Sequence, residues 1–302
     1  MTVPATAPIG VISQYNLLER LDPSGPGELY RARDTRVGRT VTIRLLPPEH
    51  APGAERQRFL ADAKSMTALS HPNITTLYDA GEHDGRVFLA FEYLKGQSLR
   101  AEMAGRPLNV RRAVELAIQI ADAIAEAHGA GFFHRGLSPE SVMITAKGHA
   151  KIPAFELASR SGFEETPAGL RLRDYDSPEE AKGGAPDDRS DVYSVAAVLY
   201  EMLTTKRPMH RGAAAPSASN PHVIKELDEV VLRALSPNPD TRIQSAATLA
   251  AELRSVVAVL DARGGAGDEE DDHQEAPSSS GRVLAVAILL VAVLAIVAWR
   301  LA

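Results

Sequence analysis

The chain has 302 residues, a formal net charge of -6, and hydrophobic and charged fractions of 44% and 24%. These proportions are those of a globular protein, and an acidic chain lacks the basic field that nucleic-acid binding requires. The absence of cysteine excludes disulfides, a thiol nucleophile and a cysteine-ligated zinc site.

The first third of the chain carries patterns typical of strands. Residues 1–13 have neither the positive nor the long apolar region of a secretory signal, and we expect them to be disordered. Further along, β-branched and aromatic residues between turn-forming residues predict strands around one helix. The predicted strands are 15–21, 28–33, 39–46, 74–78 and 87–91, and the helix is 54–68.

Helical periodicity dominates from Val110 onward. Val114, Ile118, Ala121 and Ala125 recur at the spacing of one helix face. A small β-rich part followed by a larger helical part predicts an α+β fold of two lobes, with a cleft between them.

Six sequence motifs occur in a fixed order between about residues 15 and 260. Together they resemble the motifs of bacterial serine/threonine protein kinases, which implies a protein kinase-like two-lobe domain over 14–261. The motifs are ELYRARDTRVGRTVTIRLLPPE, HPNITTLYDAGEHDGRVFLAFEYLKGQSL, HRGLSPESVMI, SPEEA, SDVYSVAAVLYEMLT and NPDTRIQSAATLAAEL.

The same resemblance indicates that groups which bind phosphates have changed. The glycine-rich loop keeps only Gly27, because its other two glycine positions carry Asp22 and Ser24. The strand lysine corresponds to Arg44, and its glutamate partner on the first helix corresponds to Asp62. Since the charges stay complementary, we expect Arg44 and Asp62 to form an ion pair.

The positions of the catalytic loop and of the metal-binding motif have changed as well. Gly136 stands where the resemblance implies the catalytic aspartate, Ser138 where it implies a lysine, and Ser141 where it implies a metal-binding asparagine. Ala154 replaces the main magnesium-binding aspartate. A general base contributes about 10²- to 10⁴-fold to the rate, so these changes predict a pseudokinase with no catalytic residue and no metal ligand.

A vestigial nucleotide pocket remains in the sequence. Thr42 replaces a smaller alanine and narrows the adenine site, so we expect no cofactor beyond a weak, magnesium-independent binding of ATP. The resemblance places in this pocket Leu21, Gly27, Leu29, Thr42, Arg44, Phe91, Glu92, Leu94 and Met143.

Residues that support the kinase scaffold are retained. The resemblance implies a hydrophobic spine between the lobes, a buried acid bonded to catalytic-loop amides, and an ion pair that anchors the activation segment. Buried charges are costly unless they are paired, so this retention predicts an ordered domain. The residues are Met66, Leu77, His134 and Phe155 in the spine, Asp191 beneath the loop, and the pair Glu179 and Arg242.

Residues 210–222, HRGAAAPSASNPH, stand where related kinases usually have a substrate-docking helix. Pro216, Pro221 and the many small residues disfavour a helix, so we expect a compact or disordered loop and loss of that docking surface.

Two segments follow the domain. Residues 262–281 are rich in glycine, serine and acids and predict a linker, whose acidic block at 268–272 is either a solvated spacer or a docking site for a partner. Residues 282–300 contain VLAVAILLVAVLAIVAW between two arginines. As a helix at ~1.5 Å per residue this run predicts a single transmembrane span, the alternative being a buried helix.

Loss of chemistry with retention of scaffold leads to two hypotheses. The first is a membrane-anchored pseudokinase, not an enzyme, that acts as a scaffold or allosteric regulator in signalling and binds a protein such as an active kinase or a phosphopeptide-binding protein. The alternative is a divergent serine/threonine protein kinase with residual ATP binding and weak phosphotransfer. In both cases we expect a single-pass, tail-anchored protein at the inner membrane, with its kinase-like domain in the cytoplasm.

Overall fold

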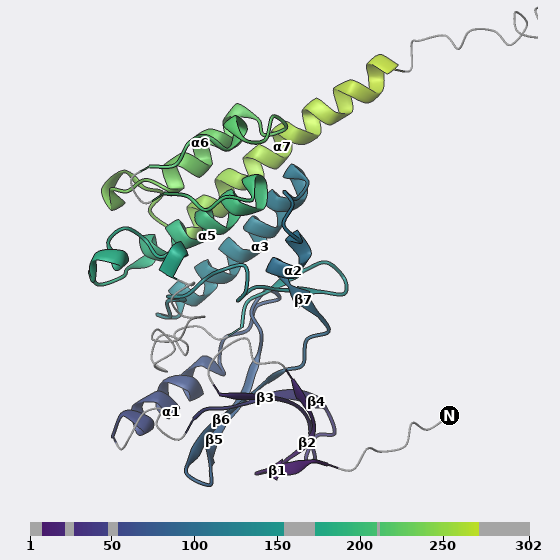
Figure 1. The fold of residues 1–302 in the computed structure, drawn as a ribbon, viewed down its shortest axis with the longest axis vertical. Helices are drawn as coiled ribbons and strands as arrows, with labels where there is room; N and C mark the ends of the chain where they lie inside the picture. Colours follow the sequence, from purple (N-terminus) through teal and green to yellow (C-terminus); the bar gives the residue numbers. More distant parts are fainter. Residues whose placement is uncertain (1–7, 22–26, 48–53, 154–172, 210–211, 272–302) are drawn as a thin grey trace, which may run out of the picture. The chain divides into compact units, whose positions relative to one another are not determined.

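A computed structural model describes residues 8–21, 27–47, 54–153, 173–209 and 212–271 (Figure 1). The chain divides into two units, Met1–Val257 and Ala258–Ala302. The described part of the second unit is the final part of one helix, so the fold that positions the site belongs to the first unit.

The small lobe is a six-stranded antiparallel sheet in the order β1-β2-β3-β4-β6-β5. Its strands are β1 Gly10–Ile12, β2 Tyr15–Leu21, β3 Glu28–Asp34, β4 Thr40–Leu45, β5 Leu77–His83 and β6 Arg86–Glu92. Because side chains alternate along each strand, one set turns inward and forms a common core. That core contains Ile12, Tyr15, Leu17, Ala32, Val41, Ile43, Leu45, Phe88 and Ala90.

Strand β1 corrects the expectation of a disordered stretch at 1–13 for residues 10–12, while residues 1–7 lie outside the described part. The chain turns at Ser13, whose φ is 50°, and returns so that Val11 pairs with Asn16. β-branched residues beside an available strand satisfy their backbone groups by pairing. Strand β5 also begins later than predicted, at Leu77, because Ile74 bridges to Ile152 instead.

Helix α1 (Ala54–Met66) packs against β5 and β6. Its buried residues Phe59, Ala63 and Met66 are four and then three positions apart, which is the spacing of one helix face.

The large lobe is mainly helical. Its helices are α2 Leu99–Met103, α3 Val110–Gly129, α5 Asp188–Thr204, α6 Lys225–Ala234 and α7 Ala246–Asp271, and its small sheet has the order β7-β8-β9, with β7 Gly96–Ser98, β8 Met143–Thr145 and β9 Ala150–Lys151. Helix α5 packs against α3 and is buried almost all round, so it forms the centre of this lobe. A capping box between Asp187 and Ser190 fixes where α5 begins.

Helix α7 extends past residue 261, the predicted end of the domain, into the segment assigned to a linker. No proline interrupts the run Ala246–Asp271, so each backbone amide can continue the helical hydrogen bonding. In the part of the chain that the structure describes, no helix is long and apolar enough to cross a membrane, and the predicted span at 282–300 lies outside that part.

Candidate functional site

Three strands of the small lobe supply most of the predicted nucleotide pocket. Leu29 of β3 pairs with Arg44 of β4, and Thr42 of β4 pairs with Phe91 of β6. Residues directly opposite on antiparallel strands lie on one face of the sheet, so Leu29 shares a face with Arg44, and Thr42 with Phe91.

Lys151 connects this sheet to the β8–β9 hairpin. Its Nζ donates to the Glu92 carboxylate at 2.8 Å and to the Ile74 carbonyl at 3.3 Å. The backbone of Lys151 also pairs with Met143. The structure therefore places Met143 and Glu92, two predicted pocket residues from different lobes, on either side of one lysine.

Most of the predicted pocket residues are partly exposed, as residues that line a binding pocket are. Phe91 is buried, with 6% of its surface exposed, whereas the others are half-buried. Their neighbours on β4, Val41 and Ile43, are completely buried. A surface of half-exposed apolar side chains around a few polar groups fits a planar base such as adenine.

Arg44 is the one positively charged side chain among the predicted pocket residues. Burial lowers the pKa of Arg44 to about 10, so the guanidinium still carries its charge at pH 7. Both Arg44 and Asp62 have interactions in the structure, and the ion pair between them stays a prediction.

The catalytic loop rests on a buried carboxylate, as predicted. Asp191 accepts hydrogen bonds from the backbone amides of His134 at 2.8 Å and Arg135 at 3.1 Å, and lies 2.8 Å from His128 Nε2. Arg135 has a left-handed φ of 52°, which these bonds help to hold. The brace expected from Asp191 is therefore confirmed.

The spine residues that the structure describes are all buried, namely Met66, Leu77 and His134, and Phe155 lies outside the described residues. Burial lowers the pKa of His134 to about 4, although the nearby Asp191 opposes this shift. The ring is therefore neutral at pH 7, as a packed spine residue requires.

The positions of the base and of the second metal ligand offer no carboxylate. Gly136 has no side chain, and the Ser141 hydroxyl accepts from the Ser138 amide at 2.9 Å and donates to the Ser138 carbonyl at 3.0 Å. Magnesium prefers carboxylate oxygens, and among the described residues no group of three or more acidic or histidine side chains is arranged so that it could hold a metal ion. Ala154 lies outside the described residues. The described part of the metal site therefore does not fit a magnesium ion.

A hydrogen-bonded cluster centred on Arg100 binds the catalytic loop through Glu140, and the sequence analysis did not predict it. Arg100 of α2 binds Glu140 at 2.8 Å, Glu201 of α5 at 2.6 Å and the Tyr175 hydroxyl at 2.6 Å, and Tyr175 also donates to Glu201. Burial opposes the charge on Arg100, but the bonds to Glu201 and Glu140 raise its pKa. No local pattern signals this cluster, because its members lie on separate elements.

The ion pair predicted beneath the activation segment is confirmed. Both Arg242 Nη atoms donate to Glu179, at 2.6 and 2.9 Å, and the Arg242 side chain is completely buried. Burial raises the pKa of Glu179, but the bonds to Arg242 outweigh this and bring it to about 2. Such bidentate, charge-assisted bonds are the strong kind.

Residues 212–222 form a compact loop, as predicted, while residues 210–211 are outside the described part. The loop contains one short 3₁₀ helix, η5, at Pro216–Ala218. Asn220 is buried and donates to the Leu203 carbonyl at 2.9 Å, and Ser217 donates its amide to Asp228 at 2.9 Å. Residues 212–222 contain no helix longer than η5, so this part of the chain has no docking helix.

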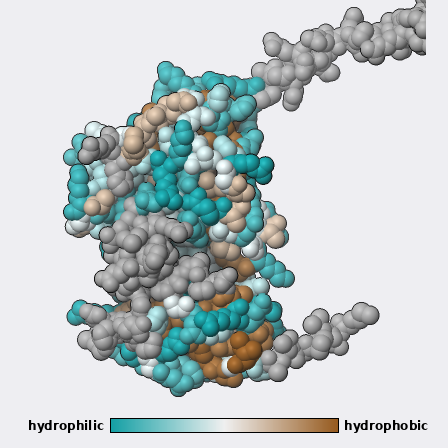
Figure 2. All heavy atoms as spheres, viewed as in Figure 1, coloured by the Kyte–Doolittle hydropathy of each residue, from teal (hydrophilic) through white to brown (hydrophobic). Residues whose placement is uncertain are grey.

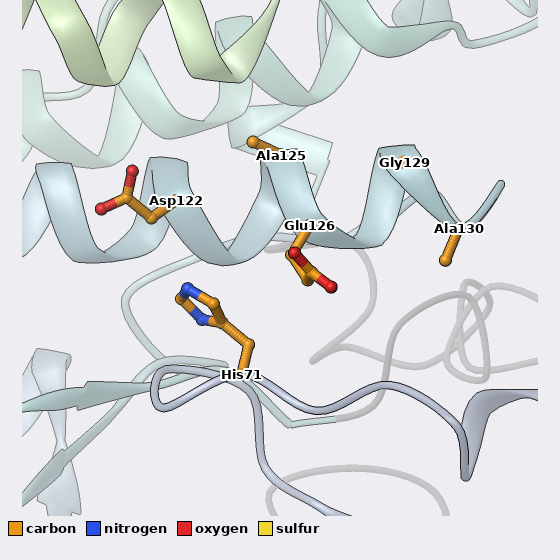
Figure 3. A pocket seen from close by; sticks show the side chains of 6 residues that line it. All are labelled: His71, Asp122, Ala125, Glu126, Gly129 and Ala130. Atoms are coloured by element: carbon orange, nitrogen blue, oxygen red, sulfur yellow. The ribbon is translucent and has the colours of Figure 1, made fainter.

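A surface cavity of about 550 Å³ lies elsewhere, beside α3 (Figure 3). It is lined by His71, Asp122, Ala125, Glu126, Gly129 and Ala130. Asp122 already accepts from Arg254 at 2.7 Å, and His71 Nδ1 accepts the Asn73 amide at 3.1 Å. None of the predicted pocket residues lines this cavity, so it does not coincide with the predicted nucleotide pocket.

Comparison with known proteins assigns the class. The family model for the protein kinase domain matches residues 15–259, so the chain belongs to the protein kinase family. It is 35% identical over 266 residues to the probable serine/threonine-protein kinase SCO3848 of Streptomyces coelicolor, and 33% identical over 272 residues to the serine/threonine-protein kinase PknB of Mycobacterium tuberculosis.

These two alignments cover 80% and 82% of this chain but only 40% and 44% of the relatives, so the chain spans less than half of their length. Among solved structures, the kinase domain of Mycobacterium tuberculosis PknI has a TM-score of 0.69 at 26% identity, covering 84% of this chain and 99% of that chain. The α+β two-lobe fold and the bacterial serine/threonine kinase family are therefore confirmed.

The comparisons contradict two expectations. The prediction of a non-enzyme is wrong, because a protein kinase domain and relatives named as serine/threonine kinases point to an enzyme. The prediction of a protein without a cofactor is wrong for the same reason, since protein kinases use ATP with a divalent metal. Replacement of residues at these positions therefore does not by itself establish loss of the whole activity.

Proposed function

We propose that this chain is a divergent serine/threonine protein kinase that binds ATP beside β3, β4, β6 and β8 and transfers phosphate slowly to hydroxyl groups of proteins. The observation that carries this proposal is the catalytic loop, which Asp191 holds through the amides of His134 and Arg135. The half-exposed residues of the predicted nucleotide pocket support it. Phosphoryl transfer depends on such positioning of the groups around the substrate.

The described residues fit the nucleotide better than the metal. Leu29, Thr42 and Met143 would hold the adenine ring, and the cation of Arg44 would lie toward the phosphates. When bound, ATP supplies the phosphoryl group. Ser141, at the position of the second metal ligand, bonds within its own turn instead.

The absence of a side chain at Gly136 sets the expected rate. The acceptor hydroxyl has to lose its proton without a positioned carboxylate, and a general base contributes about 10²- to 10⁴-fold. Slow transfer rather than none follows, because orientation and electrostatic stabilisation act independently of the base.

Thermal stability and phosphotransfer test this proposal together. We expect ATP with magnesium or manganese to raise Tm. At an ATP concentration of ten times Kd, the free energy of unfolding should increase by about 1.4 kcal/mol. We also expect labelled phosphate to appear on a protein substrate. Thr42→Trp should abolish both signals by filling the pocket, whereas Thr67→Trp, at an exposed position of the same lobe, should leave both unchanged. No Tm shift and no labelling with either metal would overturn the proposal.

We also propose that residues 283–299 anchor the domain to the inner membrane as a single C-terminal span, with the kinase domain in the cytoplasm and a signalling protein as its partner. The uncharged run between Arg282 and Arg300 supports this location. The chain should stay in the membrane fraction after an alkaline wash, and a version ending at Gly281 should be released. Release of the intact chain, or digestion of its domain by protease added outside spheroplasts, would contradict the location.

A further inference from the structure

Exposed hydrophobic side chains gather on one part of the small lobe. Among the described residues, Ile9, Val11 and Val37 expose 60%, 53% and 64% of their surface, and Met209 of the large lobe exposes 72%. Figure 2 shows hydrophobic residues at the surface of the six-stranded sheet, beside the start of the described chain. Three such side chains in one region differ from the scattered single ones of an ordinary surface.

The strand register brings Ile9 and Val11 to the same side of the sheet as Arg33. Val11 pairs with Asn16, which pairs with Arg33 across β1, β2 and β3. Ile9 lies two positions before Val11, with its amide bonded to the Leu17 carbonyl at 2.8 Å, so alternation places Ile9 on the same side.

Val37 occupies the turn between β3 and β4. That turn is held beside the β1–β2 turn, because the Thr35 amide donates to the Gln14 carbonyl at 3.0 Å. The exposed end of the β3–β4 hairpin therefore lies next to β1.

Positive charge accompanies the apolar side chains. Arg31 pairs with Glu19, and Arg39 lies 3.5 Å from Asp34. Arg33 and Arg36, in contrast, are exposed and form no ion pair with another described residue. We call Ile9, Val11, Arg33, Arg36 and Val37 the basic-apolar face.

We infer that the basic-apolar face docks on an anionic lipid surface. Arginines that are not neutralised within the protein can bind lipid phosphates, while protruding aliphatic side chains enter the boundary between headgroups and acyl chains. The face lies on an edge strand and a hairpin turn, which suits a flat bilayer better than a peptide that needs a groove. This inference is independent of phosphotransfer.

The uncharged run 283–299 adds a reason for a lipid partner. If it spans the bilayer as proposed, it holds the domain close to the surface, where the high effective concentration lets a face of modest affinity bind. The face would then fix which side of the small lobe meets the membrane.

The cysteine-free sequence allows a direct test on the full chain. Val37→Cys, labelled with a polarity-sensitive fluorophore, gives a single reporter on the face, and Met209→Cys gives an equally exposed control. The fluorescence emission of both labelled variants is measured with phosphatidylcholine vesicles that do or do not contain phosphatidylglycerol. We expect a blue shift of the Val37 reporter only, with anionic vesicles only, and its loss in high salt.

Charge reversal identifies the arginines. Arg33→Glu with Arg36→Glu should weaken the anionic-lipid response about 30-fold or more, at ~1 kcal/mol for each arginine removed. Arg58→Glu with Arg106→Glu changes the net charge equally at exposed positions elsewhere and should have little effect. Equal responses with neutral vesicles, or in both charge variants, would overturn the inference. A shift that follows protein concentration without lipid would identify a second copy as the occupant and overturn it too.

Discussion

The two sides of the catalytic loop differ in how many of the residues typical of protein kinases they retain. Beneath the loop, the Asp191 carboxylate holds two backbone amides, and Arg242 holds Glu179 by two bonds. On the reacting side, Gly136 has no side chain and Ser141 bonds within its own turn. The difference teaches that support of the backbone and chemistry on the substrate are separable, because losing one partner of a buried, bonded charge destabilises the fold whereas losing a general base lowers only the rate.

Restoring the chemistry should give the largest effect. Gly136→Asp combined with Ala154→Asp is expected to raise kcat/KM for phosphotransfer about 10²- to 10⁴-fold, because the first change returns a base to a loop that is already held and the second returns a metal ligand to the sequence. Gly136 is not among the described glycines with positive φ, so the new side chain causes no backbone strain there. Rates with labelled ATP and a protein substrate measure this change.

Gly129→Asp is the control for that experiment, because a side chain at Gly129 meets nothing within 4 Å and lies away from the predicted pocket. Its rate should equal that of the parent chain. An unchanged rate in the double variant, with ATP binding intact, would mean that the support beneath the loop is also inadequate and that the comparison is wrong.

Removing the support should unfold the domain rather than slow it selectively. Asp191→Ala is expected to cost about 3–5 kcal/mol of unfolding free energy, because the His134 and Arg135 amides lose their buried acceptor. Urea denaturation measures the cost. Asp188→Ala, at a carboxylate that is 52% exposed in the same helix, should cost only about 0.5 kcal/mol. Similar costs for the two variants would contradict the assigned role of Asp191.

The features predicted from the sequence depend on local pattern or on motifs in the order and spacing of the kinase family. Strand β2 and helix α3 follow from periodicity, and the bonds of Asp191 and Glu179 follow from the kinase resemblance. Strand β1 was not predicted, because its three residues become a strand only through their pairing with β2.

The Arg100 cluster was beyond the reach of sequence reasoning for a different reason. Arg100, Glu140, Tyr175 and Glu201 lie on separate elements, and many pairings of the chain's charges satisfy the same sequence. Activity was also misjudged, because the sequence shows which groups are replaced but not how much rate depends on each one.

Protonation should weaken the support in a defined pH window. His134 has a pKa of about 4 in the folded chain and about 6.5 when unfolded, so below pH 6.5 the unfolded chain binds a proton that the folded chain does not. Stability should therefore fall by roughly 3 kcal/mol between pH 6.5 and 4. His134→Phe should remove this loss, whereas His149→Phe, at an exposed position, should keep it. Identical pH profiles would show that His134 is not the group responsible.

The loop at 212–222 should give the smallest effect and should separate support from docking. Asn220 donates to the Leu203 carbonyl at 2.9 Å and accepts the His222 amide at 3.1 Å, so its side chain holds the loop to the end of α5. Asn220→Ala is expected to cost about 1–2 kcal/mol, because two backbone groups lose a partner. Ser219→Ala, one residue earlier and exposed, should stay within about 0.5 kcal/mol of the parent in the same denaturation experiment.

Phosphotransfer by the Asn220 variant decides what this loop does. If the loop only closes the lobe where relatives of this family place a docking helix, the rate per folded molecule should equal that of the parent, because no predicted pocket residue lies in it. A lower rate at unchanged stability would mean that the loop still binds the protein substrate. The loop would then act on the substrate rather than only support the fold. The docking function would have been retained without the helix.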